Sequence, residues 1–404
     1  MMAPKAQLKR RLTIWLVILY GLGTTIGAGI YALVGKIAGV AGYHAPWSFL
    51  VAACLVAFTV ISYAEMSRRY PHAAGAALYV REGLGCVRLS TLVGLLVVLA
   101  GLTSASALAN AFIGYLNEII AIDATTAIIL TVLVLGGIAA IGITESVTVA
   151  SVITAIEIFG LLLVVGVNYD SFGALPEHTN AFAPPIDIQG WALVFSGAML
   201  AFYAFLGFED MVVIAEEVRD VKRNLPLAIF STLAITAMLY LLVVTVAVMA
   251  MPPEELAMSE APLAALYQKG TGSSPTLINV IAGLAIINGV LIQLIMASRL
   301  LYGLASTQQI PNVFAHVDPR THTPLVATAT ATAVTLLLSL LGTLTGLAEA
   351  TSAVMLMVFA LVNLSAWRVK RRMPAEEGLP SIPTWVPLAG FVISLAFVVN
   401  QLWP

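Results

Sequence analysis

Two short stretches of the chain combine glycine with hydroxyl, aromatic or acidic side chains inside apolar surroundings. They are GLGTTIGAGI, residues 21–30, and AFYAFLGFED, residues 201–210. Glycine in a helix interior is less favourable than alanine by up to about 1 kcal/mol, so the four glycines of the first stretch and the single glycine of the second predict interrupted helices. Inside a bilayer, the amides and carbonyls freed by an interruption are tolerated only where they line a cavity or meet a ligand. Both stretches therefore indicate a binding site.

The backbone groups of such a site suit a zwitterion. Free N–H groups at the start of a half-helix favour a carboxylate, helped by the helix dipole. Free carbonyls at the end of a half-helix favour an ammonium group. The spacing of Gly23 and Gly27 has another explanation, because small residues four apart also let helices pack closely. The second interruption, at residues 201–210, favours the site.

Long hydrophobic segments carry these residues. Of the 404 residues, 60% are hydrophobic and only 10% are charged, too few charges to cover a soluble protein of this size. Segments of about 20 apolar residues can cross a bilayer. We place eleven of them at 12–39, 46–66, 88–118, 125–143, 146–167, 188–217, 225–250, 276–306, 324–343, 346–367 and 384–403. The prediction is an all-α membrane protein with about eleven transmembrane helices.

The basic residues predict an orientation. If the N-terminus is cytoplasmic and the helices alternate, only Lys36 and Lys269 of the 19 Lys and Arg residues lie outside. Cytoplasmic loops are enriched in these residues, so the pattern predicts a multi-pass protein of the plasma or inner membrane with its N-terminus inside. Eleven spans would place the C-terminus outside. The expected surroundings are the lipid bilayer, and no basic patch with interleaved aromatics suggests nucleic acid.

The two interrupted helices occupy corresponding positions in two halves of the chain. The first opens helices 1–5 and the second opens helices 6–10, and they enter the membrane from opposite sides. Such a pair indicates an inverted repeat. We predict one transmembrane domain over 1–404, with repeats at 12–167 and 188–367 and an extra helix at 384–403.

Four segments resemble the amino acid–polyamine–organocation transporter superfamily, and within it the permeases similar to cationic amino acid transporters. They are GLGTTIGAGIYALVG (21–35), YAEMSRRYPHAAGAALY (63–79), FYAFLGFEDMVVIAEEVRDVKRNLPLAI (202–229) and SRLLYGLASTQQIPNVFAHVDPRTHTP (298–324). The resemblance implies the leucine-transporter-type five-plus-five inverted repeat with discontinuous helices 1 and 6. It also implies secondary transport of an amino acid or related amine by alternating access, by symport or by exchange. No cofactor, metal or catalytic residue is expected.

The resemblance also implies which residues meet the substrate. The backbone of Thr24, Thr25, Ile26, Gly27 and Ala28 would receive the carboxylate, and carbonyls of Phe202, Tyr203, Ala204, Phe205 and Leu206 would receive the amine. Tyr203 and Phe205 would shape or gate the pocket, with aromatic packing as the alternative. Glu209 follows the second interruption, where it could carry a proton or cap freed amides, and we predict capping.

Glu157 is the predicted coupling residue. It lies near the middle of helix 5, one turn from Thr154, at the position where many relatives have a lysine that replaces a sodium ion. A carboxylate at the bilayer centre costs roughly 2.5–3.5 kcal/mol or more, so such groups usually face the bundle interior and serve transport. We predict that Glu157 carries a proton. The alternatives are that it binds sodium, or that it only bonds a carbonyl of helix 1.

Two other classes of protein fit the sequence less well. An intramembrane enzyme would need a nucleophile and base, or metal ligands, at membrane depth, and no serine–histidine or HExxH pattern accompanies Glu157. A sensor would normally carry a soluble signalling domain, for which the sequence shows no candidate. The ATP-binding pattern GxxxxGK[ST] is also absent. Transport therefore remains the favoured function.

Overall fold

The computed structural model describes residues 12–71, 75–117, 120–141, 147–174, 182–318, 321, 323–373 and 382–402. Long helices dominate this part of the chain: α1 (Ile14–Ala41), α2 (Ala45–Arg69), α4 (Val87–Asn117), α5 (Ala124–Ile141), α6 (Val147–Val167), α8 (Ile188–Ala204), α9 (Val221–Ala250), α12 (Thr276–Ser306), α13 (Leu325–Leu341), α14 (Leu344–Arg372) and α15 (Trp385–Leu402). Shorter elements connect them: α3 (Gly75–Leu84), α10 (Pro253–Met258), α11 (Pro262–Thr271) and the 3₁₀ helices η1 (Gly42–His44), η2 (Tyr169–Ala174), η3 (Phe208–Glu217) and η4 (Asn312–Ala315).

The long helices are those of a multi-pass membrane protein. Seven segments of the described chain are long and apolar enough to cross a bilayer, and four shorter apolar helices accompany them. The eleven long helices of this part of the chain overlap the eleven predicted spans one for one. Leu130, Leu133 and Val134 of α5 are each more than half exposed, as expected of side chains that face lipid.

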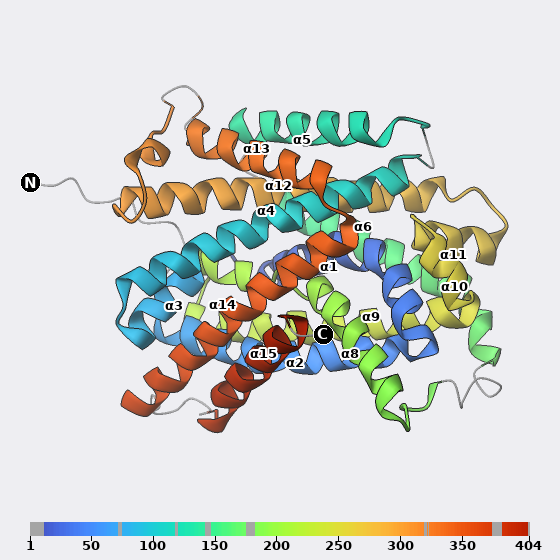
Figure 1. The fold of residues 1–404 in the computed structure, drawn as a ribbon, viewed down its shortest axis with the longest axis horizontal. Helices are drawn as coiled ribbons and strands as arrows, with labels where there is room; N and C mark the ends of the chain where they lie inside the picture. The colour runs from blue at the N-terminus through green and yellow to red at the C-terminus, as the bar shows by residue number, and fades with distance from the viewer. Residues whose placement is uncertain are drawn as a thin grey trace, which may run out of the picture.

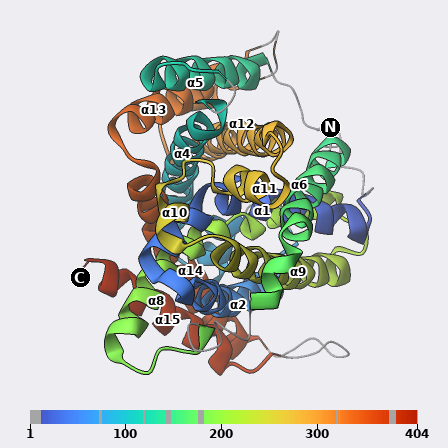
Figure 2. The ribbon, with the colours of Figure 1, turned by 90° about the vertical axis from the view of Figure 1, so that its right-hand side faces the viewer.

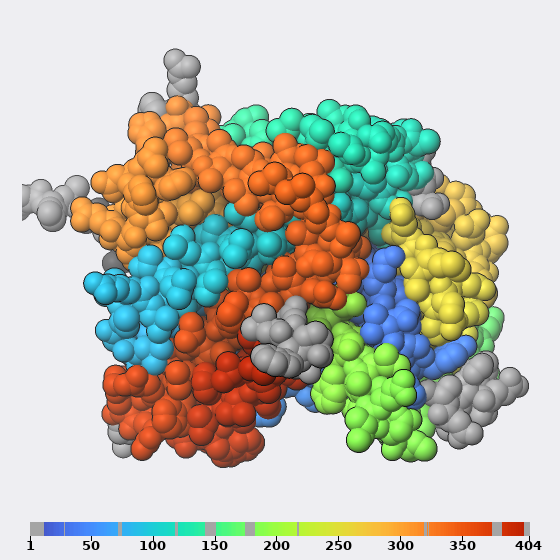
Figure 3. Space-filling model, viewed as in Figure 1, coloured from blue at the N-terminus to red at the C-terminus, as the bar shows by residue number. Residues whose placement is uncertain are grey.

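The helices enclose α1. It packs against α8 and α9 on one side and against α6, α10 and α12 on others. α4 crosses in front of α12 and also contacts α14, while α5 pairs with α13 at the upper edge and α15 lies beside α14 and α2 (Figures 1 and 2). On the face in Figure 3, the blue chain that contains α1 is visible only in a limited area beside the green and yellow segments. On this face the interrupted helix is thus largely covered by the others, and most residues of α1 are buried.

Both predicted interruptions are present. α1 departs from helical geometry at Gly27 (φ 15°, ψ −143°). α8 ends at Ala204, Gly207 adopts φ 118°, and the chain continues as the 3₁₀ helix η3. A φ of 118° is strained for any residue with a Cβ, which explains the glycine. The expected leucine-transporter-type fold with discontinuous helices 1 and 6 is confirmed; helix 1 is α1, and helix 6 consists of α8 and η3. The repeat boundaries 12–167 and 188–367 stay a prediction.

Candidate functional site

The two interruptions touch each other. A Cβ added to Gly207 would lie 2.5 Å from the carbonyl carbon of Thr24, and one added to Gly29 would lie 2.8 Å from Cα of Ala204. Real Cβ atoms do not approach backbone so closely, so these glycines permit the contact. Gly27 differs, because no atom lies within 4 Å of the position its Cβ would take. Close packing therefore explains Gly29 and Gly207, while Gly27 sits at the break beside open space.

Tyr240 of α9 joins the broken ends. Its hydroxyl lies 2.9 Å from the carbonyl oxygen of Thr25 in helix 1 and 2.9 Å from that of Ala204 in helix 6. The carbonyl oxygen of Ile26 is a third acceptor, at 3.3 Å. One hydroxyl has a single proton to donate, so these carbonyls share it. The phenol thus partly satisfies carbonyls that the two interruptions release.

Aromatic packing holds the Tyr240 ring in place. The ring of Phe205 lies 5.1 Å from it and that of Phe49 lies 5.8 Å from it, centroid to centroid. Phe205 is fully buried, and it is not among the residues that line the two cavities described below. The structure therefore places Phe205 in the packing behind the site.

A cavity of about 50 Å³ lies where the broken helices meet α4 and α12. Its lining comprises Gly23, Thr24, Thr25, Gly27, Gly29, Ser104, Leu108, Tyr203, Leu206, Asp210, Gly289, Ile292 and Gln293. The structure thus brings five of the predicted substrate residues to one cavity: Thr24, Thr25, Gly27, Tyr203 and Leu206. Tyr203 is anchored across the site, since its hydroxyl lies 3.0 Å from Oγ of Ser104. The volume holds a few water molecules.

The other predicted substrate residues lie outside the cavity lining. Ile26, Phe202, Ala204 and Phe205 are buried in the core beside it, so their assignment depends on backbone groups alone. The side chain of Ala28 is outside the described part of the structure. The assignment of substrate contacts remains a prediction for all of these residues.

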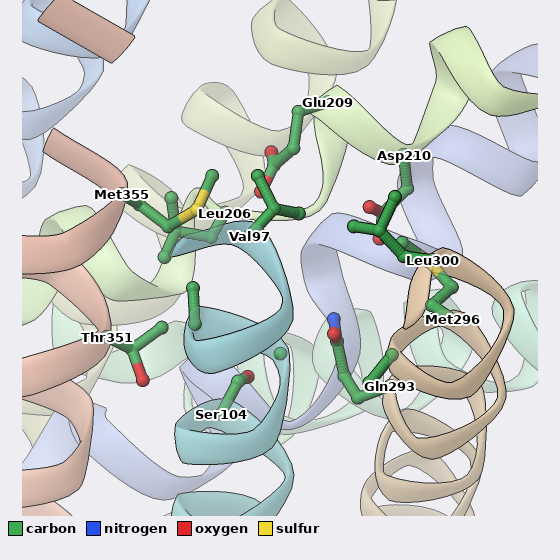
Figure 4. Close-up of a pocket in the computed structure, with 13 residues that line it drawn as sticks. Val97, Ser104, Leu206, Glu209, Asp210, Gln293, Met296, Leu300, Thr351 and Met355 are labelled. Carbon is green, nitrogen blue, oxygen red and sulfur yellow. The ribbon is translucent and has the colours of Figure 1, made fainter. Parts of the chain in front are cut away.

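A second cavity, of about 30 Å³, adjoins the first and shares Ser104, Leu206, Asp210 and Gln293 with it. Figure 4 shows Glu209 and Asp210 extending into it from η3, opposite Gln293 of α12 and Ser104 of α4. Oε2 of Glu209 accepts a hydrogen bond of 2.8 Å from the backbone N–H of Gly207. This bond confirms that Glu209 caps an amide at the second interruption.

Glu157 lies on α6 behind helix 1, with 1% of its surface exposed. Its backbone carbonyl accepts a hydrogen bond of 2.7 Å from the hydroxyl of Tyr31. One turn earlier, the Thr154 side chain packs directly against Gly23. These two contacts lie on either side of the break at Gly27. Glu157 itself is not among the residues that line the two cavities.

Sequence reasoning did not assign Ser104, Asp210, Tyr240 or Gln293 to the site. Tyr240 resembles an ordinary apolar-helix aromatic, and only the fold shows its three carbonyl partners. Gln293 is a polar residue in the apolar run of α12 and could have been noticed for that reason. Asp210 directly follows Glu209, and capping explained only one carboxylate of the pair.

A helical bundle built around two broken helices that meet at a cavity with polar and apolar lining defines an integral membrane protein of the broken-helix type. The comparison with known proteins specifies the family: the amino acid permease family model matches residues 12–404. The chain belongs to the amino acid permease family.

Similar proteins come from plants and bacteria. The chain is 28% identical to cationic amino acid transporter 3, mitochondrial, of Arabidopsis thaliana, and 29% identical to cationic amino acid transporter 2, vacuolar, of the same plant. Each alignment covers 93% of this chain, but the chain spans only 65% and 62% of those two proteins. It is 25% identical to the branched-chain amino acid permease BcaP of Bacillus subtilis, over 98% of this chain and 89% of BcaP.

Proposed function

We propose that the protein is a secondary transporter that moves amino acids or related amines across a membrane by alternating access. The observation that carries this proposal is the meeting of two broken helices at one cavity, which Gly27 lines from the first helix and Tyr203 and Leu206 line from the second. Broken helices provide amide and carbonyl ends at membrane depth, which are the partners of a carboxylate and an amine. We infer that the Thr24–Ala28 backbone receives the carboxylate and the Phe202–Leu206 stretch the amine.

The names of the relatives support amino acids as the substrate class. Two relatives are named as cationic amino acid transporters and one as a branched-chain amino acid permease. These names differ in the side chain of the substrate and agree in its α-amino and α-carboxyl groups. Agreement in that part supports recognition of the zwitterion by the broken helices.

Closure of the site supports alternating access. The side chain of Thr25 is 4% exposed, and the two cavities together hold only a few waters. At the beginning of helix 1, the carbonyl of Leu12 accepts a hydrogen bond of 3.0 Å from the N–H of Arg219, after η3. An amino acid can enter only if helices move, and breaking this contact is one way to open the end nearest the N-terminus.

We further propose that the protein lies in the plasma or inner membrane with its N-terminus in the cytoplasm. The bias of Lys and Arg toward one set of loops supports this orientation. Lys36 and Lys269 are the two exceptions that the arrangement places outside.

Glu157 is our candidate for proton coupling. Glu157 is buried. Its carbonyl contacts Tyr31 after the helix 1 break, and Thr154, one turn earlier, contacts Gly23 before the break. These contacts support a link between the charge of Glu157 and the shape of the site. Glu157→Gln keeps the size and hydrogen bonding of the neutral acid. We expect this variant to bind substrate and to lose the pH dependence of uptake; unchanged pH dependence would exclude Glu157 as the proton carrier.

Thermal unfolding of the purified protein tests the proposed function. A ligand that binds only the folded state stabilises it by about 2.7 kcal/mol at one hundred times its Kd. The screen uses amino acids, diamines and polyamines, and each hit is then measured as radiolabelled uptake into proteoliposomes. If none of these compounds raises the melting temperature or enters the liposomes, the proposal is wrong.

A further inference from the structure

Asp210 is a buried carboxylate at the junction of the two cavities, and one of its two oxygens has no hydrogen-bond partner among the described residues. It lines both of them, and only 5% of its surface is exposed. Its Oδ2 atom is fully buried and has no hydrogen-bond partner among the described residues. In Figure 4 the carboxylate points into the space between η3 and α12.

The neighbours of Asp210 do not neutralise it. The adjacent carboxylate, Glu209, already accepts the Gly207 amide. From α2 and α3, Tyr63 and Tyr79 lie on the same side with buried hydroxyls, and α4, α12 and α14 contribute the neutral side chains Ser104, Gln293 and Thr351. Neither cavity has a lysine or arginine among the described residues that line it.

An isolated negative charge at this depth is costly unless it is paired or protonated. The charge of Glu209 next to it adds repulsion. One positive charge therefore has to be close to the pair whenever the site is closed around its substrate. The α-ammonium group is not available for this, because it is assigned to the carbonyls of helix 6.

We propose that Asp210 binds one additional positive charge each time the site is occupied. With a basic amino acid, the charge is the ammonium or guanidinium group at the end of the side chain. With a neutral amino acid, a proton binds the Asp210 carboxylate on one side of the membrane and leaves it on the other. In both cases one net positive charge crosses with the substrate. The inference rests on the proposed substrate class and site, and it assigns the coupled proton to Asp210 in place of Glu157.

The lining of the second cavity fits this proposal. It combines the apolar side chains of Leu206, Met296, Leu300 and Met355 with the carboxylates of Glu209 and Asp210 (Figure 4). A side chain with a methylene stem and a cationic tip can use both kinds of group, since long cationic side chains bury the stem along apolar surface. Methionine side chains are flexible and can repack around an apolar side chain of another shape.

The test measures amino acid uptake and proton movement together in proteoliposomes. The probes are radiolabelled lysine and leucine, with a pH-sensitive dye inside the vesicles, and the proteins are the wild type and Asp210→Asn. We expect wild-type leucine uptake to acidify the interior and lysine uptake not to. Asp210→Asn should take up leucine without acidification, and its uptake of lysine relative to leucine should fall at least tenfold.

Two further variants serve as controls. Asp123→Asn makes the same chemical change in the loop before α5, where Asp123 accepts a 2.9 Å bond from the Thr126 amide; this bond lowers the pKa of the carboxyl, and asparagine can cap in its place. We expect this variant to behave as the wild type. Asp210→Glu retains the carboxylate and should keep both the lysine preference and the acidification. If it folds and loses both, the proposal is wrong.

Each outcome either identifies the source of the positive charge or overturns the proposal. Wild-type uptake of lysine alone, lost in Asp210→Asn, assigns the charge to the side chain. Uptake of leucine with protons, and loss of the proton signal in Asp210→Asn, assigns it to the proton. An unchanged lysine-to-leucine ratio with unchanged acidification overturns the proposal, as does acidification that only Glu157→Gln abolishes. A wild type that transports no amino acid or amine contradicts the proposed function itself.

Discussion

Tyr240→Phe removes the one hydroxyl that joins the two broken helices. The substitution leaves the ring and therefore its contacts with Phe49 and Phe205. It removes a donor that lies 2.9 Å from the carbonyls of both Thr25 and Ala204. Both carbonyls then have one fewer partner in a fully buried position, since none of the surface of Tyr240 is exposed.

The expected magnitude follows from the cost of unsatisfied buried groups. Leaving a buried acceptor without its donor costs about 1–3 kcal/mol. A factor of ten in an equilibrium constant corresponds to about 1.4 kcal/mol. We expect Tyr240→Phe to lower the free energy of unfolding by about 1–3 kcal/mol. Because the freed carbonyls belong to the proposed substrate site, we also expect KM for uptake to change about 5- to 140-fold, the range that this energy spans.

Tyr115→Phe is the matched control. Tyr115 is also buried, and its hydroxyl donates a 2.6 Å hydrogen bond to the carbonyl of Tyr31, in helix 1 beyond the break. It is not one of the cavity-lining residues. Thermal unfolding in detergent and uptake into proteoliposomes are measured for both variants. We expect both to lose stability and only Tyr240→Phe to change KM. Equal KM values in the two variants would refute a role of Tyr240 in shaping the site.

Three further predictions concern the break, the end of α2 and the orientation. Gly27→Leu should abolish uptake because the leucine side chain would fill the open space beside residue 27. Gly27→Ala should fold and transport. Normal uptake by Gly27→Leu would show that the pocket lies elsewhere. The carboxylate of Glu65 pairs with Arg68 at 2.9 Å and with Arg69 at 2.8 Å, and it lies 3.6 Å from Lys370. Glu65→Ala should therefore lower the free energy of unfolding by about 3–5 kcal/mol. An unchanged melting temperature in thermal unfolding would contradict this prediction. Lys269→Cys should react with an impermeant maleimide outside cells while the exposed native Cys86 does not; the reverse pattern would invert the orientation.

The amino-acid sequence alone determined the class of fold and the location of the breaks. Hydrophobic segments of bilayer length are a local property, because each backbone must satisfy its own hydrogen bonds in lipid. The glycines at 21–30 and the glycine in 201–210 are also local signals, and the structure places the breaks at Gly27 and next to Gly207. The capping role of Glu209 could be predicted because its partner, Gly207, is two residues away.

Only the tertiary structure decided which side chains meet at the breaks. Tyr240 lies 215 residues from Thr25 along the chain, and the packing of α9 against helices 1 and 6 is what places its hydroxyl between their carbonyls. Gln293 and Ser104 join the cavity for the same reason, through α12 and α4. The glycines of helix 1 look alike in the sequence, yet Gly29 serves close packing and Gly27 faces open space, because only the arrangement of neighbouring helices decides what a Cβ would meet.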